Sequence, residues 1–103
     1  MNKSVQAAAG QQGSMTYNSV VTEDFSACFS RLPEEVRNQA RRGYRIWRAN
    51  PSHPGLRFKA IRGHEGLYSV RVGRGWRALG RLEDETVTWF WIGSHADYDG
   101  LVD

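Results

Sequence analysis

A histidine and two arginines lie on or beside a predicted β-hairpin and have side chains suited to acid–base and phosphate chemistry. Arg77 and Arg81 fall in the first of two β-rich runs, and His95 follows the second. The acidic turn Glu83-Asp84-Glu85 joins the runs. Histidine exchanges protons near neutral pH, and arginine binds phosphate oxygens in pairs. A plain core hairpin with a surface histidine explains the same pattern, and spacing alone does not decide between the two.

Basic residues are concentrated in the middle of the chain. Residues 31–81 contain thirteen lysines and arginines, twelve of them arginines, against three glutamates. Residues 82–103 contain six acidic residues and no lysine or arginine. Because arginine suits phosphate contacts and stacking on bases, we expect a polyanionic partner. An ordinary solvated basic surface is the alternative.

The length of 103 residues predicts one domain with one modest core. We assign this domain to residues 15–103 and interpret residues 1–14, which are small, polar and aperiodic, as a disordered leader or a cloning remnant. No apolar run is long enough to span a bilayer, and no secretory signal is recognisable, so we expect a soluble cytoplasmic protein. A single cysteine excludes an intrachain disulfide, and the three histidines lack the spacing of a zinc site. We therefore expect no metal and no other cofactor.

Two helices are expected before the main strands. Thr22 has the character of an N-cap ahead of two acids, and apolar residues recur at helical spacing from Phe25 to Leu32. Pro33 suits the first turn of a second helix, which should end near Asn50 because a proline follows. The short connection makes the pair an antiparallel helical hairpin.

The rest of the chain predicts about four antiparallel strands, at residues 56–61, 67–72, 76–82 and 87–92. Period-two alternation places Arg57 and Lys59 on one face of the first strand, and Trp89 and Trp91 on one face of the last. Residues 16–21 are a weaker candidate for a short strand. The expected fold class is α+β, with the helical hairpin packed on the sheet.

The order and spacing of several short motifs resemble the RelE/ParE toxins of bacterial type II toxin–antitoxin modules. The resemblance covers roughly residues 25–102, and no single motif is specific by itself. The matching motifs are Leu32-Pro33, Asn50-Pro51-Ser52-His53-Pro54, Leu56-Arg57-Phe58-Lys59, Tyr68-Ser69-Val70-Arg71, Gly75-Trp76-Arg77-Ala78-Leu79-Gly80, Trp89-Phe90-Trp91-Ile92-Gly93-Ser94-His95 and Asp97-Tyr98-Asp99.

This resemblance implies a small α+β fold whose sheet carries a concave basic surface. RelE-like members cut messenger RNA on the ribosome without a metal, because the 2′-hydroxyl attacks the adjacent phosphate and the protein supplies proton transfer and positive charge. ParE-like members inhibit DNA gyrase instead. We expect an endoribonuclease that acts on translated mRNA and is held inactive by a cognate antitoxin. The alternatives are a gyrase inhibitor without nuclease activity and an inactive basic nucleic-acid-binding module.

The resemblance also implies roles for individual residues. Arg77 resembles the arginine that stabilises the phosphate, His95 the histidine that transfers a proton, and Tyr98 a tyrosine that orients or stacks a base. The residues expected to contact the RNA backbone are Arg57, Lys59 and Arg81. Asp97 and Asp99 depart from the best-studied ribonucleases, which often carry lysine or arginine there. Structural roles stay open for these residues. His95 can be a hydrogen-bonded turn residue, Tyr98 can pack at the C-terminus, and Arg57 and Lys59 can form an ordinary solvated strand face. Arg77 can form a salt bridge to an acid of the hairpin.

Overall fold

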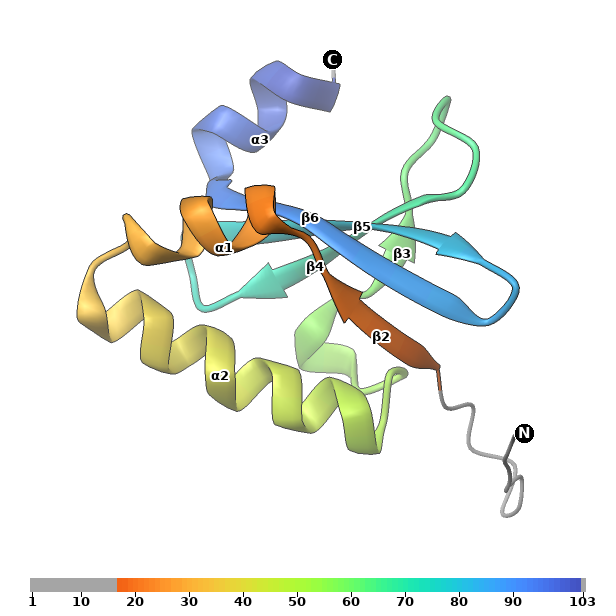
Figure 1. The fold of residues 1–103 in the computed structure, drawn as a ribbon, viewed down its shortest axis with the longest axis horizontal. Helices are drawn as coiled ribbons and strands as arrows, with labels where there is room; N and C mark the ends of the chain where they lie inside the picture. Colours follow the sequence, from red (N-terminus) through yellow and green to blue (C-terminus); the bar gives the residue numbers. More distant parts are fainter. Residues whose placement is uncertain (1–16, 103) are drawn as a thin grey trace.

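The structure is a computed structural model that describes residues 17–102, so the expected leader at residues 1–14 lies outside the described residues. Figure 1 shows the arrangement of its helices and strands. None of the helices within this range is long and apolar enough to cross a membrane. The elements in chain order are β2 (Asn18–Val21), α1 (Glu23–Ser30), α2 (Glu34–Ala49), the 3₁₀-helix η2 (Pro54–Leu56), β3 (Lys59–Ala60), β4 (Leu67–Val72), β5 (Trp76–Glu83), β6 (Thr86–Ser94) and α3 (His95–Val102).

The strands form one sheet in the order β2-β6-β5-β4-β3 (Figure 1). Strands β3 to β6 pair antiparallel, as the predicted meander requires. The weaker candidate at residues 16–21 is also a strand, but it pairs with β6 in parallel. The predicted α+β class is therefore confirmed, with five strands instead of about four and with one parallel edge.

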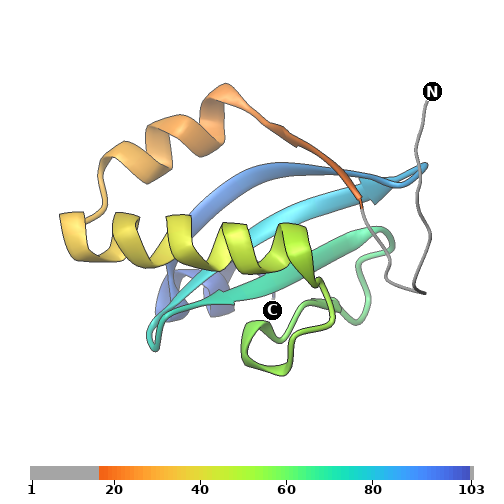
Figure 2. The ribbon, with the colours of Figure 1, turned by 90° about the horizontal axis from the view of Figure 1, so that it is seen from below.

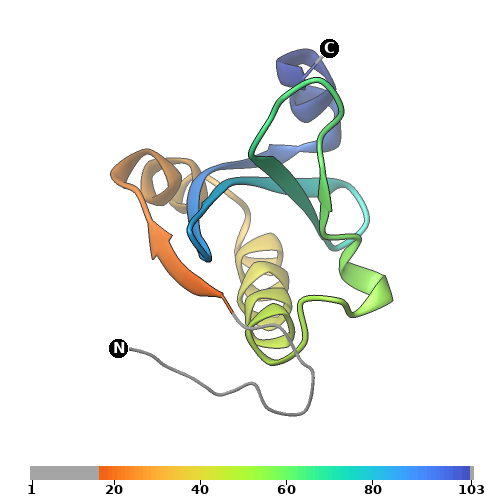
Figure 3. The same cartoon turned by 90° about the vertical axis from the view of Figure 1, so that its right-hand side faces the viewer.

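The two expected helices are present and run in opposite directions on one face of the sheet (Figure 2). The Thr22 side chain accepts a hydrogen bond of 3.1 Å from the backbone N–H of Phe25, which confirms the N-cap. Pro33 is the N-cap of α2 and not its first residue, and the helix ends directly before Asn50. Figure 3 shows α3 on the other side of the sheet from α1 and α2.

Trp47 of α2 forms the centre of the core and is 2% exposed. Its ring meets Trp89 edge-on, with ring centres 5.2 Å apart, and Phe58 edge-on at 5.6 Å. Tyr17 stacks on it at 5.8 Å. Each such aromatic pair contributes about 0.5–1.5 kcal/mol beyond the area it buries. This cluster fixes α2 against the sheet and leaves the opposite face of the sheet free for other roles.

The predicted strand at residues 56–61 is wrong in its first half. Residues 54–56 form η2 instead, where Pro54 pre-sets the turn and the His53 ring accepts a 3.1 Å hydrogen bond from the N–H of Gly55. Arg57 then takes the left-handed conformation, with φ of 50°, and only Lys59 and Ala60 pair with β4. Arg57 is consequently outside the sheet and does not share a strand face with Lys59.

The prediction that Trp89 and Trp91 share a face of β6 is also wrong. The pairing of β6 with β5 shifts at Phe90, so that Trp89 lies opposite Gly80 while Trp91 lies opposite Leu79. An extra residue at a β-bulge reverses the side-chain alternation that follows it. Trp89 therefore enters the core below the helices, and Trp91 lies on the opposite face of the sheet.

The C-terminal helix α3 was not expected. Ser94 precedes it and accepts a 3.1 Å hydrogen bond from the backbone N–H of Asp97, the bond that a serine N-cap makes. The helix contacts both β5 and β6 on the face away from α1 and α2. It therefore covers one end of the sheet face that carries the predicted site.

Candidate active site

Three of the predicted site residues, Arg77, His95 and Tyr98, lie together where β5 meets the start of α3. Arg77 pairs with Gly93 across β5 and β6. Two residues later the chain leaves the sheet, and the N–H of His95 donates a 2.8 Å hydrogen bond to the carbonyl of Gly75. This bond joins the first residue of α3 to the start of β5. The β5–β6 pairing and the α3 N-cap together place the three side chains within reach of one another.

The Arg77 guanidinium is the centre of this cluster. Its Nε–H donates to Nδ1 of His95 over 3.4 Å, and its Cζ lies 5.3 Å from the centre of the Tyr98 ring. The rings of His95 and Tyr98 are near-parallel at 6.0 Å. Nη1 of Arg77 is buried without a hydrogen-bond partner. A buried guanidinium N–H without an acceptor costs stability, so its presence here is unfavourable for the free fold.

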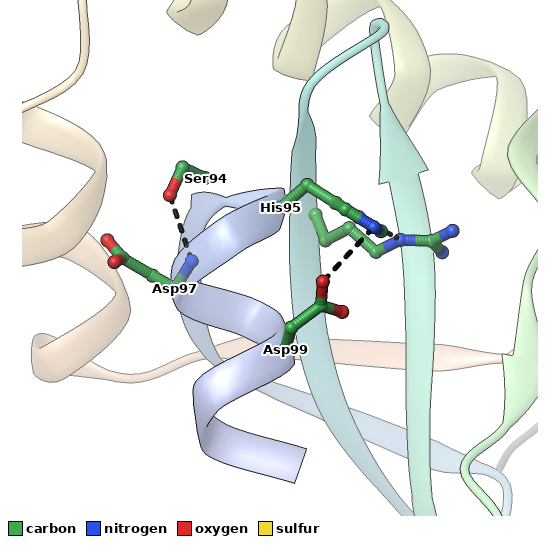
Figure 4. Close-up of polar contacts among 5 residues, drawn as sticks. Ser94, His95, Asp97 and Asp99 are labelled. Atoms are coloured by element: carbon green, nitrogen blue, oxygen red, sulfur yellow. Dashed lines mark hydrogen bonds and ion pairs between the residues drawn. The ribbon is translucent and has the colours of Figure 1, made fainter. Parts of the chain in front are cut away.

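The second nitrogen of the His95 ring faces an acid (Figure 4). Nε2 lies 3.5 Å from Oδ2 of Asp99, one helical turn further along α3. Because the Nδ1 atom accepts from Arg77, the neutral ring carries its proton on Nε2 and can donate it to this carboxylate. Figure 4 shows Asp97 on the other side of α3, away from the His95 ring.

The sheet face beside this cluster carries a row of cations. Lys59 pairs with Ser69 of β4, which pairs with Leu79 of β5, so all three point to one face. Paired residues and alternate residues of a strand share a face. The cationic side chains on the face with Leu79 are Lys59, Arg71, Arg77 and Arg81. Sequence reasoning missed Arg71, although the alternation of residues 67–72 across the turn from Arg77 was the signal that could have found it.

The remaining predicted residues are not part of this arrangement. Arg57 follows η2 and has no strand partner. The ring of His53 caps η2, and Nε2 of His64 lies 3.3 Å from the carbonyl of Val102. Both of these histidines therefore have structural contacts. Across residues 17–102, no three His, Cys, Asp or Glu side chains are grouped so that they could hold a metal ion.

Asp99 is the residue of the site that sequence reasoning treated only as a departure from a family pattern. The spacing of His95 and Asp99, four residues apart, brings two side chains together only if they lie on a helix. The motif Ser94-His95-Ala96-Asp97 has the form of a capping box and was the signal that could have predicted this helix.

Comparisons with known proteins agree with this fold. The chain of a RelB–RelE complex from Methanococcus jannaschii superposes with a TM-score of 0.66 at 15% identity, covering 82% of this chain and 99% of that one. A chain of the RelBE2 complex from Mycobacterium tuberculosis superposes with a TM-score of 0.62 at 24% identity, covering 81% of this chain and 95% of that one. A chain of the DinJ–YafQ complex from E. coli superposes with a TM-score of 0.62 at 14% identity, covering 80% of this chain and 96% of that one.

No curated protein matches the sequence. A family model does match it: the ParE-like toxin domain fits residues 34–100, which run from the start of α2 into α3. That range is more than half of the chain and includes Arg77, His95 and Tyr98. The chain therefore belongs to the ParE-like toxin domain family, within the RelE/ParE superfamily of toxins from toxin–antitoxin modules.

Proposed function

We propose that this toxin is a metal-independent endoribonuclease that cuts translated messenger RNA. The observation that carries the proposal is the 3.4 Å approach of Arg77 Nε to His95 Nδ1 at the end of a basic sheet face. RNA cleavage by its own 2′-hydroxyl requires a group that moves a proton and a cation that stabilises the phosphorane. These two side chains supply both requirements.

In the proposed reaction, the Arg77 guanidinium turns from His95 to the bound phosphate, which frees the Nδ1 lone pair. Nδ1 then takes the proton of the 2′-hydroxyl, and the oxygen attacks the adjacent phosphorus. The Arg77 guanidinium binds the non-bridging oxygens through its N–H donors. The bond to the 5′ oxygen breaks, this oxygen takes a proton from water, and the hydroxide left behind takes the proton from the His95 imidazolium. The products are a 2′,3′-cyclic phosphate and a 5′-hydroxyl. Tyr98 supports the guanidinium through its ring face and offers its edge and hydroxyl to a neighbouring base.

The cations beside Arg77 are the proposed contacts to the RNA backbone. Lys59, Arg71 and Arg81 project from three neighbouring strands to the face that carries Arg77. Each phosphate that such a side chain neutralises releases a counterion, so affinity should fall as salt rises. Arg57 lies between η2 and the start of β3, outside the sheet, and would contact only RNA that extends beyond the strand face.

We propose a cognate antitoxin as the protein partner, since several of the structural relatives are toxin–antitoxin complexes. A cleft of about 390 Å³ opens between α1, α2 and the sheet. Its lining is mostly apolar, including Phe25, Phe29 and Trp47, with Arg41 and Arg45 also contributing. A segment with an apolar face and acidic flanks fits this surface, because charges of opposite sign would meet at its rim.

A gyrase inhibitor without nuclease activity is the second candidate. Two observations favour it: the matching family model is ParE-like, and Asp99 of α3 lies beside His95 at the proposed phosphate site. Acidic side chains there oppose the approach of RNA. The two candidates differ in the molecule that the toxin affects first: messenger RNA for the ribonuclease, and DNA, through gyrase, for the gyrase inhibitor.

Expression of the toxin without an antitoxin tests the proposal. We expect protein synthesis to stop within minutes and primer extension to reveal discrete cuts in translated mRNA, while the same mRNA without ribosomes is cut less. Induction of the DNA-damage response with intact mRNA would instead support the gyrase inhibitor and reject the ribonuclease.

A matched pair of variants separates chemistry from charge. His95→Gln should lower the cleavage rate by ~10²–10⁴-fold, the range for loss of a general base. Arg74→Gln removes an exposed arginine from the β4–β5 turn and should leave that rate within a small factor of the wild type. Circular dichroism and antitoxin binding check that both variants fold.

A further inference from the structure

Asp99 is an acidic side chain inside a site whose other charged groups are cations. Its Oδ2 lies 3.5 Å from His95 Nε2, and the two side chains are 54% and 53% exposed. A carboxylate in this position repels the phosphate that Arg77 would bind, so its presence calls for a separate physical reason. We propose that Asp99 is a positioning residue that fixes the orientation and proton placement of the His95 ring, an inference that rests on the proposed function of His95.

The backbone places the two side chains on one face of α3. His95 is the first residue of the helix, and Asp99 follows four residues later, the spacing at which helical side chains meet. The ring is thus held from both sides. Arg77 donates to Nδ1, and Nε2 faces the carboxylate. With its proton held on Nε2, the ring keeps Nδ1 unprotonated, and the Nδ1 lone pair becomes free for the 2′-hydroxyl when the Arg77 guanidinium turns to the bound phosphate.

The carboxylate also matters once His95 has taken a proton. The imidazolium would form at the N-terminus of α3, where the helix dipole is positive, and beside the Arg77 guanidinium. The helix dipole and the guanidinium both repel the positive charge of the imidazolium, and the negative charge of Asp99 offsets this repulsion. The groups that face the ring are Arg77 from β5 and Tyr98 and Asp99 from α3.

The two contacts are long for hydrogen bonds, at 3.4 and 3.5 Å. Catalytic hydrogen bonds are often long in a free enzyme and shorten when substrate excludes water from the site. The arrangement therefore supplies the direction of each contact before RNA binds, and exclusion of water by the RNA should shorten the contact between Nε2 and Asp99.

Asp97 provides a matched control, because it is an acid on the same helix with its side chain on the other side of α3 (Figure 4). Asp99→Ala and Asp97→Ala each remove one negative charge near the RNA, so both should bind RNA slightly more tightly. Only Asp99→Ala should slow single-turnover cleavage, by roughly 10- to 100-fold, the range for groups that orient another functional group. For Asp99→Ala we therefore expect a higher RNA affinity together with a lower cleavage rate.

A damaged fold would weaken RNA binding and cleavage together. An Asp99→Ala variant that cleaves at the wild-type rate, or one that loses affinity and rate in parallel, would overturn the positioning role. Asp99→Glu should recover part of the rate, because it restores a carboxylate on the same face of the helix.

Nitrogen-15 NMR of the histidine rings tests the same inference without relying on activity. At alkaline pH the His95 signals, identified by their loss in His95→Gln, should report one tautomer with the proton on Nε2 in the wild type and in Asp97→Ala. Asp99→Ala should move them towards the average of the two tautomers. Unchanged signals in folded Asp99→Ala would reject the inference. If the wild type cuts no RNA, the proposed function fails, while these spectra still decide whether Asp99 positions the ring.

Discussion

Arg71 and Arg77 face each other across β4 and β5 as directly paired residues. Like charges in this position destabilise an antiparallel pair. Each side chain has another contact: Arg71 Nε donates to the carbonyl of Gly73 over 3.1 Å, and Arg77 lies over Tyr98. Because an anion between them would relieve the repulsion, the pairing is favourable for phosphate binding and unfavourable for the free fold.

Replacing Arg71 should therefore change stability and RNA binding in opposite directions. Arg71→Thr puts a residue with high β-propensity in the strand and removes the repulsion, so the free energy of unfolding should rise by about 0.2–1 kcal/mol. RNA affinity should fall, and its salt dependence should become shallower. Urea unfolding and RNA titration at several salt concentrations measure the two effects. Arg74→Thr, in the adjacent turn, is the control that should change neither by a comparable amount.

Arg77→Lys keeps the positive charge and tests the guanidinium itself. Lysine has no Nε–H fixed in a plane beside Nδ1 of His95 and cannot lie flat over Tyr98, so the cleavage rate should fall by at least ~10-fold although the net charge is unchanged. Arg81→Lys, on the same strand and face, should retain most of the rate. Equal rates for the two lysine variants would show that only charge matters at position 77.

Tyr17 should make the fold less stable at alkaline pH. Burial, and to a lesser extent the negative charge of Tyr68, raises the pKa of the Tyr17 phenol above its ordinary value of 10.0. The folded state therefore holds the phenol proton more tightly than the unfolded state, and the resulting stability is present below pH ~10 and is lost as the pH rises through the raised pKa. Tyr17→Phe keeps the ring and removes the phenol proton on which this pH dependence rests. Urea unfolding between about pH 8 and 11 should give a steeper decline for the wild type than for the variant, and parallel curves would contradict the prediction.

The β5–β6 turn stores strain that glycine can remove. Its two central residues, Asp84 and Glu85, have positive φ of 49° and 68°. This conformation costs a residue with a Cβ roughly 1–2 kcal/mol and is the one for which two-residue hairpins favour glycine at the second position. Glu85→Gly should raise the free energy of unfolding by about 1 kcal/mol, as measured by thermal or urea unfolding. Glu83→Gly, within β5, should lower it instead, because glycine weakens a strand interior.

The periodic parts of this chain could be predicted from its sequence, and the irregular parts could not. Thr22 caps α1 as local capping rules predict, Pro33 is the N-cap of α2 and so lies one position earlier than they place it, and the alternation of residues 76–82 gives the correct face to Arg77 and Arg81. Alternation fails at Phe90 because a bulge depends on how two strands align, which neither strand encodes alone. The same limit applies to Arg57, whose conformation follows from the turn before it.

The sequence predicted most residues of the candidate site but not how they are arranged. Arg77, His95 and Tyr98 are brought together as expected, but the helix that joins His95 to Asp99 is short and weakly amphipathic, so apolar periodicity gave no sign of it. Arg71 requires the register of β4 against β5, a tertiary property. Asp99 could be predicted only from knowledge of the helix α3, and Arg71 only from knowledge of how β4 pairs with β5.

The parallel pairing of β2 with β6 joins the beginning of the described chain to its last strand, with Asn18 opposite Thr86. The ribosome makes the chain from its N-terminus, so β2 must wait until β6 has left the exit tunnel before it can join the sheet. His95 and α3 emerge even later. A nascent chain thus lacks both an edge of its sheet and part of its proposed active site until β6 and α3 have left the exit tunnel.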